Sequence, residues 1–266
     1  MADTSAAIDT LSFLTRSEPR TRILLQLLSS GSLSRRQFRD RLSVSRSTIT
    51  RALAALEERA LVGHDGETYH LTPTGRIVAE TIADAVDTLE VTDDLSTFLE
   101  WFPYSEYDID LDELRAADII VSTDVDPYAP SRRHAESVGE HDQFRMLLPS
   151  IDLQLARSTD DRLKNGDLEL ELIISPEMEE TISTGEFASV LREQIESGSM
   201  TVLVSPDPIP FYLGLAGSGT VQIGVEDEEG FPRAVLETDT ESVRSWCETV
   251  YQQFRADART KSAEEF

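Results

Sequence analysis

Residues 45–71 read SRSTITRALAALEERALVGHDGETYHL, and this stretch decides the fold of the N-terminal part of the chain. Its first half predicts a helix, because Ile49, Leu53 and Leu56 recur at the spacing of one buried helical face and Ser45 is a typical capping residue. A shorter helix and a three-residue connection come directly before it. Two helices joined in this way form a helix-turn-helix.

The second half of the stretch predicts a β-hairpin. Asp65-Gly66 stands between two short apolar segments, and this pair of residues favours the tight turn of a hairpin. Upstream, a further helix is predicted to begin after Ser17 and to end at Gly31. Three helices followed by a hairpin predict a winged helix-turn-helix over about residues 17–75.

The polar residues of the predicted third helix face outward, because its apolar residues must face the core. Short hydroxyl side chains and arginines at such a surface suit entry into the major groove, where arginine can pair with guanine through two hydrogen bonds. Thr48 and the helix start at residues 34–37 are placed to hold phosphates. The predicted DNA-binding residues are Ser34, Arg35, Arg36, Ser45, Arg46, Ser47, Thr48, Thr50 and Arg51.

Residues 45–62 resemble the recognition helix of bacterial-type winged-helix regulators, in which this helix reads duplex DNA. The hairpin departs from the usual pattern, because its tip at residues 64–67 has no arginine and two acids. We therefore expect this hairpin, the wing of the fold, to lie near the DNA backbone or to make little contact. The alternative is a winged-helix fold used only for protein contacts, that is, a protein-interaction adaptor.

The charge of the chain is strongly acidic and unevenly distributed. The net charge is −26, from 24 Lys and Arg against 50 Asp and Glu. Residues 1–75 hold 10 arginines against 8 acids, however, so this segment alone is slightly basic. An acidic chain with only two lysines is typical of proteins that stay soluble in molar salt. A segment spared this acidification is what contact with a polyanion requires.

Composition excludes several other classes of protein. The single cysteine, Cys247, rules out an internal disulfide framework and a cysteine-rich metal cluster. No apolar run is long enough to cross a bilayer, and the first twenty residues lack the pattern of a signal peptide. We expect a soluble, cytoplasmic protein that binds no cofactor, metal or membrane.

The fold class expected is α+β, with the winged helix-turn-helix followed by an α/β sensor-like domain with a mixed sheet. The expected domains are the DNA-binding domain at 1–75, a linker or dimerisation helix at 76–99, an α/β domain at 100–258 and a flexible tail at 259–266. We call the winged helix-turn-helix the head. Within the linker, an apolar stripe predicts a dimer interface, a connecting rod or simple packing on the head. Its residues are Ile77, Ile82, Val86 and Leu89.

From about residue 100, strand-length apolar runs alternate with helical stretches. The predicted order is a strand at 118–121, a helix at 131–148, a strand at 168–174, a helix at 184–196 and a strand at 201–204. This alternation predicts a largely parallel sheet. An antiparallel meander at 211–237 and a last helix at 241–258 follow.

The second part resembles the C-terminal domain of archaeal, especially haloarchaeal, regulators related to methanogenesis regulators. Four segments carry this resemblance: 117–121, 127–132, 144–149 and 172–177. Such domains look like sensor modules, and some resemble a phosphodiesterase fold. The chain has no His-x-Lys, which phosphodiesterase chemistry of the phospholipase type needs, and no other convergent catalytic set, so we expect no enzyme.

A small-molecule site is predicted where the strands of the second part end. Ligands of open α/β sheets collect outside the carboxyl ends of parallel strands. Two arginines at a helix start could hold an anion there, which suggests an anionic metabolite such as a phosphorylated one. In the alternative, the arginines only pair with neighbouring acids. The predicted ligand-binding residues are Ser122, Asp124, Arg132, Arg133, Ser175 and Ser205.

Together these features predict a sequence-specific transcription regulator. We expect it to bind a pseudo-palindromic double-stranded DNA operator as a homodimer, with half-sites about one helical turn apart. The second domain is expected to sense a metabolite and to adjust DNA affinity through the placement of the two heads.

Overall fold

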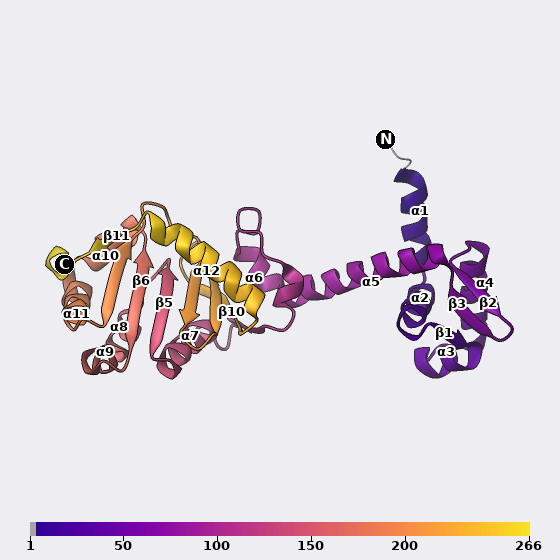
Figure 1. The fold of residues 1–266 in the computed structure, drawn as a ribbon, viewed down its shortest axis with the longest axis horizontal. Helices are drawn as coiled ribbons and strands as arrows, with labels where there is room; N and C mark the ends of the chain where they lie inside the picture. Colours follow the sequence, from indigo (N-terminus) through magenta and orange to yellow (C-terminus); the bar gives the residue numbers. More distant parts are fainter. Residues whose placement is uncertain (1–3) are drawn as a thin grey trace. The chain divides into compact units, whose positions relative to one another are not determined.

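The computed structural model describes residues 4–266, which form two compact units. The first unit ends at Glu90 and the second begins at Val91, so the boundary falls inside helix α5 (Pro73–Asp94) (Figure 1). The fold class predicted from the sequence is confirmed: a winged helix-turn-helix precedes an α/β unit with a mixed sheet.

The first unit is a winged helix-turn-helix. Its elements before α5 are α1 (Thr4–Thr15), α2 (Glu18–Ser30), β1 (Ser32–Ser34), α3 (Arg35–Leu42), α4 (Arg46–Glu58), β2 (Val62–Asp65) and β3 (Thr68–Leu71). Strands β2 and β3 form the predicted hairpin, with Gly66 at a positive φ of 61° in the turn, and β1 adds a third antiparallel strand beside β3. The sequence analysis did not foresee β1 or α1.

The core of this unit is built from the predicted apolar faces. Phe38, Ile49, Leu53 and Leu56 are all at most 1% exposed. Truncating one of these buried side chains to alanine typically costs about 3 kcal/mol, so these residues fix the outward direction of the polar side of α4.

The wing is fastened to the start of α5. A Cβ atom at Gly75 would lie only 1.7 Å from the carbonyl oxygen of Leu61, so only glycine fits there. The hydroxyl of Thr72 accepts a hydrogen bond from the Gly75 amide at 2.9 Å, and the Thr72 amide donates to Leu61 at 3.1 Å. These contacts fix the hairpin to the core through backbone atoms.

The second unit is a three-layer α/β/α sandwich around one sheet of eight strands (Figure 1). Its strands are β4 (Asp118–Val121), β5 (Gln143–Leu148), β6 (Glu169–Ile174), β7 (Met200–Val204), β8 (Tyr212–Ala216), β9 (Val221–Glu226), β10 (Pro232–Thr238) and β11 (Arg259–Lys261). The spatial order is β11-β7-β6-β5-β8-β9-β10-β4, in which only β5–β6 and β6–β7 are parallel pairs.

Side chains alternate between the two faces of this sheet. On β5, for example, Phe144 and Met146 pack on one face, whereas Leu147 packs on the other. The first face is covered by α7 (Ala129–Glu140), α8 (Leu153–Ser158), α9 (Asp160–Asn165), α10 (Pro176–Ile182) and α11 (Gly185–Glu196).

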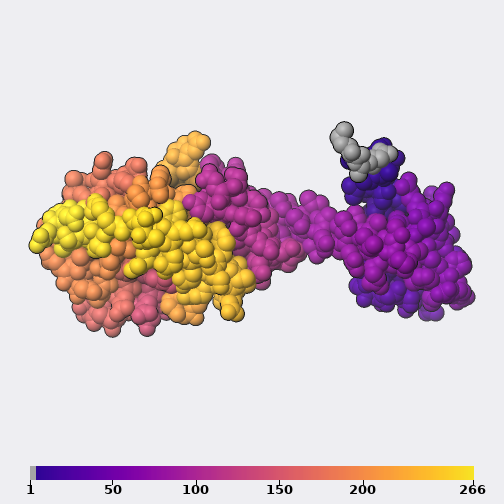
Figure 2. Space-filling model, turned by 45° about the horizontal axis from the view of Figure 1, so that its top comes forward, coloured from indigo at the N-terminus to yellow at the C-terminus, as the bar shows by residue number. Residues whose placement is uncertain are grey.

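The opposite face is covered by the end of α5, α6 (Ser96–Trp101), a short 3-10 turn η1 (Leu111–Leu114) and α12 (Glu241–Ala256). In the space-filling view, the yellow C-terminal segment that includes α12 lies across this face (Figure 2). Val243, Cys247 and Tyr251 are the α12 residues at its centre, each at most 1% exposed.

Three expectations for the second half of the chain are wrong. The predicted helix 131–148 ends at Glu140 and is followed by the central strand β5. An apolar run such as residues 144–148 fits a buried strand as well as a buried helix, and parallel pairing with β6 decides the outcome. The sheet is mixed, as the predicted fold class states, but the strand at 118–121 does not join the parallel strands as its alternation with helices suggested, because β4 pairs antiparallel with β10 at the far edge.

The C-terminal residues do not form the expected flexible tail. Residues 259–261 form β11, which pairs with β7 in an antiparallel register, and a 3-10 turn η2 (Ala263–Glu265) follows. Lys261 is only 3% exposed and donates hydrogen bonds to Glu179 at 2.9 Å and to the Glu265 carbonyl at 3.0 Å. The sequence could not show this, because strand pairing works through the backbone.

The apolar stripe predicted on α5 is also divided. Ile82 is buried and Val86 half-buried in the core of the first unit, whereas Ile77 and Leu89 are 66% and 69% exposed. Val91 and Leu95 instead belong to the core of the second unit. The single helix α5 thus contributes side chains to two separate cores.

Candidate functional site

Helix α4 presents a polar face that starts at a well-formed N-cap. The Ser45 hydroxyl accepts a hydrogen bond from the Thr48 amide at 3.2 Å. The core side chains Ile49, Leu53 and Leu56 anchor the helix, so the residues between them point outward. Arg46, Ser47, Thr50 and Arg51 are all exposed.

The arginines of this face have no acidic partner. Among the residues that the structure describes, no ion pair involves Arg46 or Arg51, whereas other arginines of the first unit, such as Arg22 and Arg76, pair with acids one helical turn away. On α3, Arg36 lies 4.0 Å from Asp40 and is itself largely exposed. Unpaired guanidinium groups on an exposed helix can receive phosphates or guanine edges.

Several of the predicted DNA-binding residues have structural contacts instead of a free polar group. The Ser34 hydroxyl caps α3 and forms a capping box with Gln37, and the hydroxyls of Ser45 and Thr48 lie 2.8 Å apart at the cap of α4. The Arg35 guanidinium donates to the Tyr69 hydroxyl at 2.6 Å, which ties α3 to the wing. The Ser47 hydroxyl lies 2.9 Å from that of Ser45, and the Thr50 hydroxyl donates to the Arg46 carbonyl at 3.0 Å. Of the nine, the side chains of Arg46 and Arg51 have no hydrogen bond or ion pair with a described residue, and Arg36 has only its 4.0 Å contact with Asp40.

The tip of the wing is exposed and acidic. His64 lies 3.7 Å from Glu57, and His70 lies 3.6 Å from Asp65. Glu67 at the turn is exposed as well. Insertion of this tip into the minor groove would bring carboxylates close to phosphates, which like-charge repulsion opposes.

The predicted ligand-binding residues fall into two separate groups. Ser175 and Ser205 follow the adjacent strands β6 and β7, and the Ser205 amide donates to the Ile174 carbonyl at 2.9 Å. Ser122 and Asp124 follow β4, which is at the other side of the sheet beyond β5, β8, β9 and β10. The hydroxyls of Ser175 and Ser205 accept hydrogen bonds from the amides of Met178 and Asp207, so both serve local turns.

Both arginines at the start of α7 are matched by acids. Arg132 forms a two-pronged ion pair with Asp126, with one N–O distance of 2.8 Å. Arg133 donates to Glu237 at 2.6 Å and contacts Glu136 and Glu140 as well, and this environment raises the pKa of the guanidinium. The hydrogen bond from Arg132 lowers the pKa of Asp126. An anion here would have to displace or outweigh these carboxylates.

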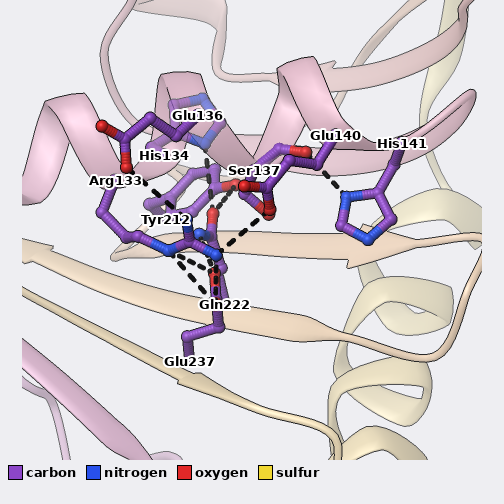
Figure 3. A network of polar contacts seen from close by, with 9 residues as sticks. All are labelled: Arg133, His134, Glu136, Ser137, Glu140, His141, Tyr212, Gln222 and Glu237. Carbon is purple, nitrogen blue, oxygen red and sulfur yellow. Dashed lines mark hydrogen bonds and ion pairs between the residues drawn. The ribbon is translucent and has the colours of Figure 1, made fainter.

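Arg133 also belongs to a buried polar network under α7 (Figure 3). Gln222 donates through Nε2 to Glu237 at 2.6 Å, and its Oε1 accepts from the Tyr212 hydroxyl at 3.1 Å. The Nδ1 atom of His134 lies 3.3 Å from the same Oε1, and its ring packs edge-on against Tyr212. Burial lowers the pKa of His134 to about 4 and raises that of Tyr212.

Sequence reasoning missed this network. Its one local signal is Gln222, a polar residue in the apolar strand β9 that is fully buried. The ring of Tyr212 lies over two glycines, since a Cβ atom at Gly214 or Gly224 would come within 2.2 or 2.9 Å of Tyr212 atoms. The glycines of this region thus make room for an aromatic ring.

Among residues 4–266, no group of three or more His, Cys, Asp or Glu side chains could hold a metal ion. Asp126 pairs with Arg132, and the His141 ring nitrogen Nδ1 lies 2.7 Å from the Ser137 carbonyl. Cys247 is buried.

Among the described residues 4–266, no helix combines the length and the apolar character that a membrane span requires.

Two family models match the chain. Residues 8–94 match the HVO_A0261 N-terminal domain, and residues 127–257 match the middle domain of the methanogenesis regulatory protein FilR1. The chain is therefore similar to such regulators in both parts, with each model covering less than half of it, and these matches support a transcription regulator. A comparison with curated proteins gives no match.

Solved structures give only distant similarities. TrmBL2, an archaeal chromatin protein, is 10% identical with a TM-score of 0.41, covering 91% of this chain and 94% of its own. Nuc, a phospholipase D family member from Salmonella typhimurium, is 13% identical with a TM-score of 0.44, covering 55% of this chain and 99% of its own. An IclR-type transcriptional regulator from Alicyclobacillus acidocaldarius is 15% identical with a TM-score of 0.24, covering 91% and 98%. Similarity at this level assigns no function to the chain.

Proposed function

We propose that this regulator binds duplex DNA sequence-specifically as a homodimer and that its second unit senses a small molecule. The observation that carries the first part is the exposed polar face at the start of α4, where Arg46 and Arg51 stand without an acid beside them. In a chain with 50 acids, Arg46 and Arg51 stand exposed with no carboxylate partner among the described residues. A face of this kind stabilises contact with a polyanion and has no other evident use.

In the proposed complex, α4 enters the major groove. Arg46 and Arg51 pair with guanine edges, while Ser47 and Thr50 contact neighbouring bases or phosphates. Arg36 and the amide groups at the starts of α3 and α4 hold the backbone. Such a protein works where the chromosome is, so we place it in the cytoplasm.

The dimer is proposed from apolar side chains that the first unit leaves exposed. Ile8 and Leu11 on α1 are 58% and 49% exposed, and Ile77 and Leu89 on α5 are more so. A second copy that covers these residues would remove apolar surface from water, at about 25 cal/mol per Å² buried. Two heads in one dimer would read half-sites about one helical turn, or roughly 10 base pairs, apart.

The acidic surface bears on the salt concentration at which the protein binds DNA. In molar salt, charges are screened within about 3 Å, so affinity depends on base-edge hydrogen bonds and shape more than on net charge. We propose that the protein works at high salt, where its many carboxylates stay hydrated. Binding should then persist in molar KCl with a shallow salt dependence.

The direct test is selection of binding sites from a random duplex library with the full-length protein in molar KCl. We expect an enriched pseudo-palindromic motif with two half-sites about one turn apart. The matched control is the double variant Arg46→Ala/Arg51→Ala, which should enrich nothing. If the wild type enriches no motif, the chain acts as a protein-interaction adaptor and the proposal is wrong.

A further inference from the structure

The second unit contains a cavity of about 140 Å³ between its sheet and the helices α7, α8 and α11. We call it the α7–α8 cavity. Its wall is mostly apolar, with Val138, Leu155 and Leu191 from the helices and Met146, Leu148, Leu170, Leu172 and Met200 from the strands. The size and the apolar part of the wall suit a small apolar ring: an engineered cavity of about 150 Å³ binds benzene.

The cavity has no cationic side chain in its lining. Arg132 and Arg133 start the same helix as His134 but do not border the space, and both are paired with acids. The charged residues that do line it are Asp152 and Glu226. Burial raises the pKa of Glu226, whose carboxylate accepts a hydrogen bond from Ser150. An anion in this space would therefore meet negative charge and no counterion.

His134 offers a hydrogen-bond acceptor at the wall. The Glu237 carboxylate can only accept from Gln222, so the Gln222 amide directs its nitrogen to Glu237 and its oxygen to His134 and Tyr212 (Figure 3). Nδ1 of His134 must then carry the proton and donate to that oxygen. In the neutral ring, Nε2 is left as an acceptor, and no described residue donates to it.

Gln194 on α11 offers a second acceptor. Its side chain is 1% exposed and donates through Nε2 to the Ala156 carbonyl at 2.6 Å. Its Oε1 receives no hydrogen bond from a described residue. A donor group of a ligand can form a hydrogen bond with this oxygen.

We propose that the α7–α8 cavity binds an uncharged molecule about the size of one six-membered ring, with a hydroxyl or N–H group that donates to Nε2 of His134. The ligand class is thus a phenol, an aromatic amine or an alicyclic alcohol, not the anionic metabolite that the arginines at the start of α7 suggested. Binding as such is independent of DNA. Its regulatory meaning rests on the proposed function, because it assumes that the second unit controls the head.

The test is isothermal titration calorimetry of the full chain in molar KCl with three probes of similar size: phenol, toluene and benzoate. We expect phenol to bind once per chain and toluene about fivefold more weakly, since toluene lacks the donor. Benzoate should not bind in the concentration range of phenol. Benzoate binding as tightly as phenol, or no binding of phenol, would overturn the proposal.

Two variants locate the site. Ala156→Leu fills the cavity from α8 and should abolish phenol binding while leaving the melting temperature unchanged or higher. His134→Phe keeps the ring against Tyr212 but removes the acceptor, so phenol should lose its fivefold preference over toluene. Unchanged binding by Ala156→Leu would show that phenol sits elsewhere and would also overturn the proposal.

A separate titration keeps the two proposals distinguishable. Operator affinity is measured with and without saturating phenol, in the wild type and in Ala156→Leu. A change in the wild type only would link the cavity to the head. Phenol binding without any change in operator affinity would leave the cavity assignment intact and contradict the sensing part of the proposed function.

Discussion

Arg51 on α4 and Arg133 on α7 carry the same guanidinium group in opposite surroundings. Arg51 is exposed and has no ion pair with a described residue, whereas Arg133 is half-buried and held by Glu237 and two further acids. The pattern extends to the two units. In the second unit, Arg145, Arg157 and Arg255 also pair with acids, at distances up to 3.0 Å.

This difference shows that the position of an arginine, and not its presence, indicates its role. Most arginines of the second unit pair with a carboxylate, whereas in the first unit Arg16, Arg41 and Arg59 share with Arg46 and Arg51 the lack of an ion pair with a described residue. A pair of arginines kept away from all acids on one helical face therefore points to an external partner. Arginines matched by acids instead stabilise the fold, and they offer little to an incoming anion.

The largest effect is expected from removing the unpaired arginines. The double variant Arg46→Ala/Arg51→Ala should lower affinity for the selected operator about a hundredfold or more, because each lost guanine contact costs about 1–3 kcal/mol. The melting temperature should stay within about 2 °C of the wild type, since both side chains are exposed. Fluorescence anisotropy with labelled operator measures the first quantity and calorimetry the second. A loss of affinity below threefold would remove the distinction between the two arginine classes.

The converse is expected for the buried pair. Arg133→Ala should lower the free energy of unfolding of the second unit by about 2 kcal/mol, since it leaves Glu237, which is 13% exposed, without its main partner. Operator affinity of the folded protein should change less than twofold. Denaturant titration, with anisotropy on the same sample, checks both. A stable Arg133→Ala variant with weakened DNA binding would mean that Arg133 contacts DNA or controls the head directly.

The buried His134 predicts that the stability of the second unit depends on pH. The folded pKa of His134, about 4, lies below its ordinary value of 6.5, so between these values the unfolded chain binds a proton that the folded chain does not. Stability should thus be nearly full above pH 6.5 and fall by about 3 kcal/mol as the pH drops to 4. Denaturant titrations at several pH values measure this, with His134→Phe as the control that flattens the curve. An equal slope in both proteins would show that His134 is not the group responsible.

The smallest effect is expected from the exposed pair at the start of α7. Arg132→Ala breaks the contact with Asp126, but both side chains are exposed, 56% and 42%, and an ion pair in this setting adds little to stability, least of all in molar salt. Neither the melting temperature nor operator affinity should change measurably. Arg132→Ala therefore serves as the matched control for Arg51→Ala. A clear loss of operator affinity in Arg132→Ala would contradict the distinction between arginines that pair with acids and the unpaired arginines of α4.

The sequence predicted the head well because its signals are local. The caps Ser34 and Ser45 and the Asp65-Gly66 turn each act within a few residues, and the apolar spacing of α4 fixes which side faces outward. The third wing strand β1 escaped prediction because three residues carry no periodicity. Its pairing with β3 depends on residues more than thirty positions away.

The second unit was predicted less completely, because long-range contacts decide it. Arg133 and Glu237 are 104 residues apart, so their pairing could be suspected but not assigned. Strand β5 was taken for the end of a helix, since its apolar run has no period that separates the two. The cavity follows from how three helices sit on the sheet, and Gln222 within an apolar strand is the one sequence signal of the polar network under α7.

The most direct test of the central claim is chromatin immunoprecipitation of the tagged native protein beside the Arg51→Ala variant and its matched control Arg132→Ala, in cells grown on different carbon sources. The account predicts sharp peaks for the wild type and for Arg132→Ala, centred on one pseudo-palindromic motif, and their loss in Arg51→Ala. Equal occupancy by all three proteins, or no occupancy by the wild type, would contradict the claim that the unpaired arginines of α4 read DNA.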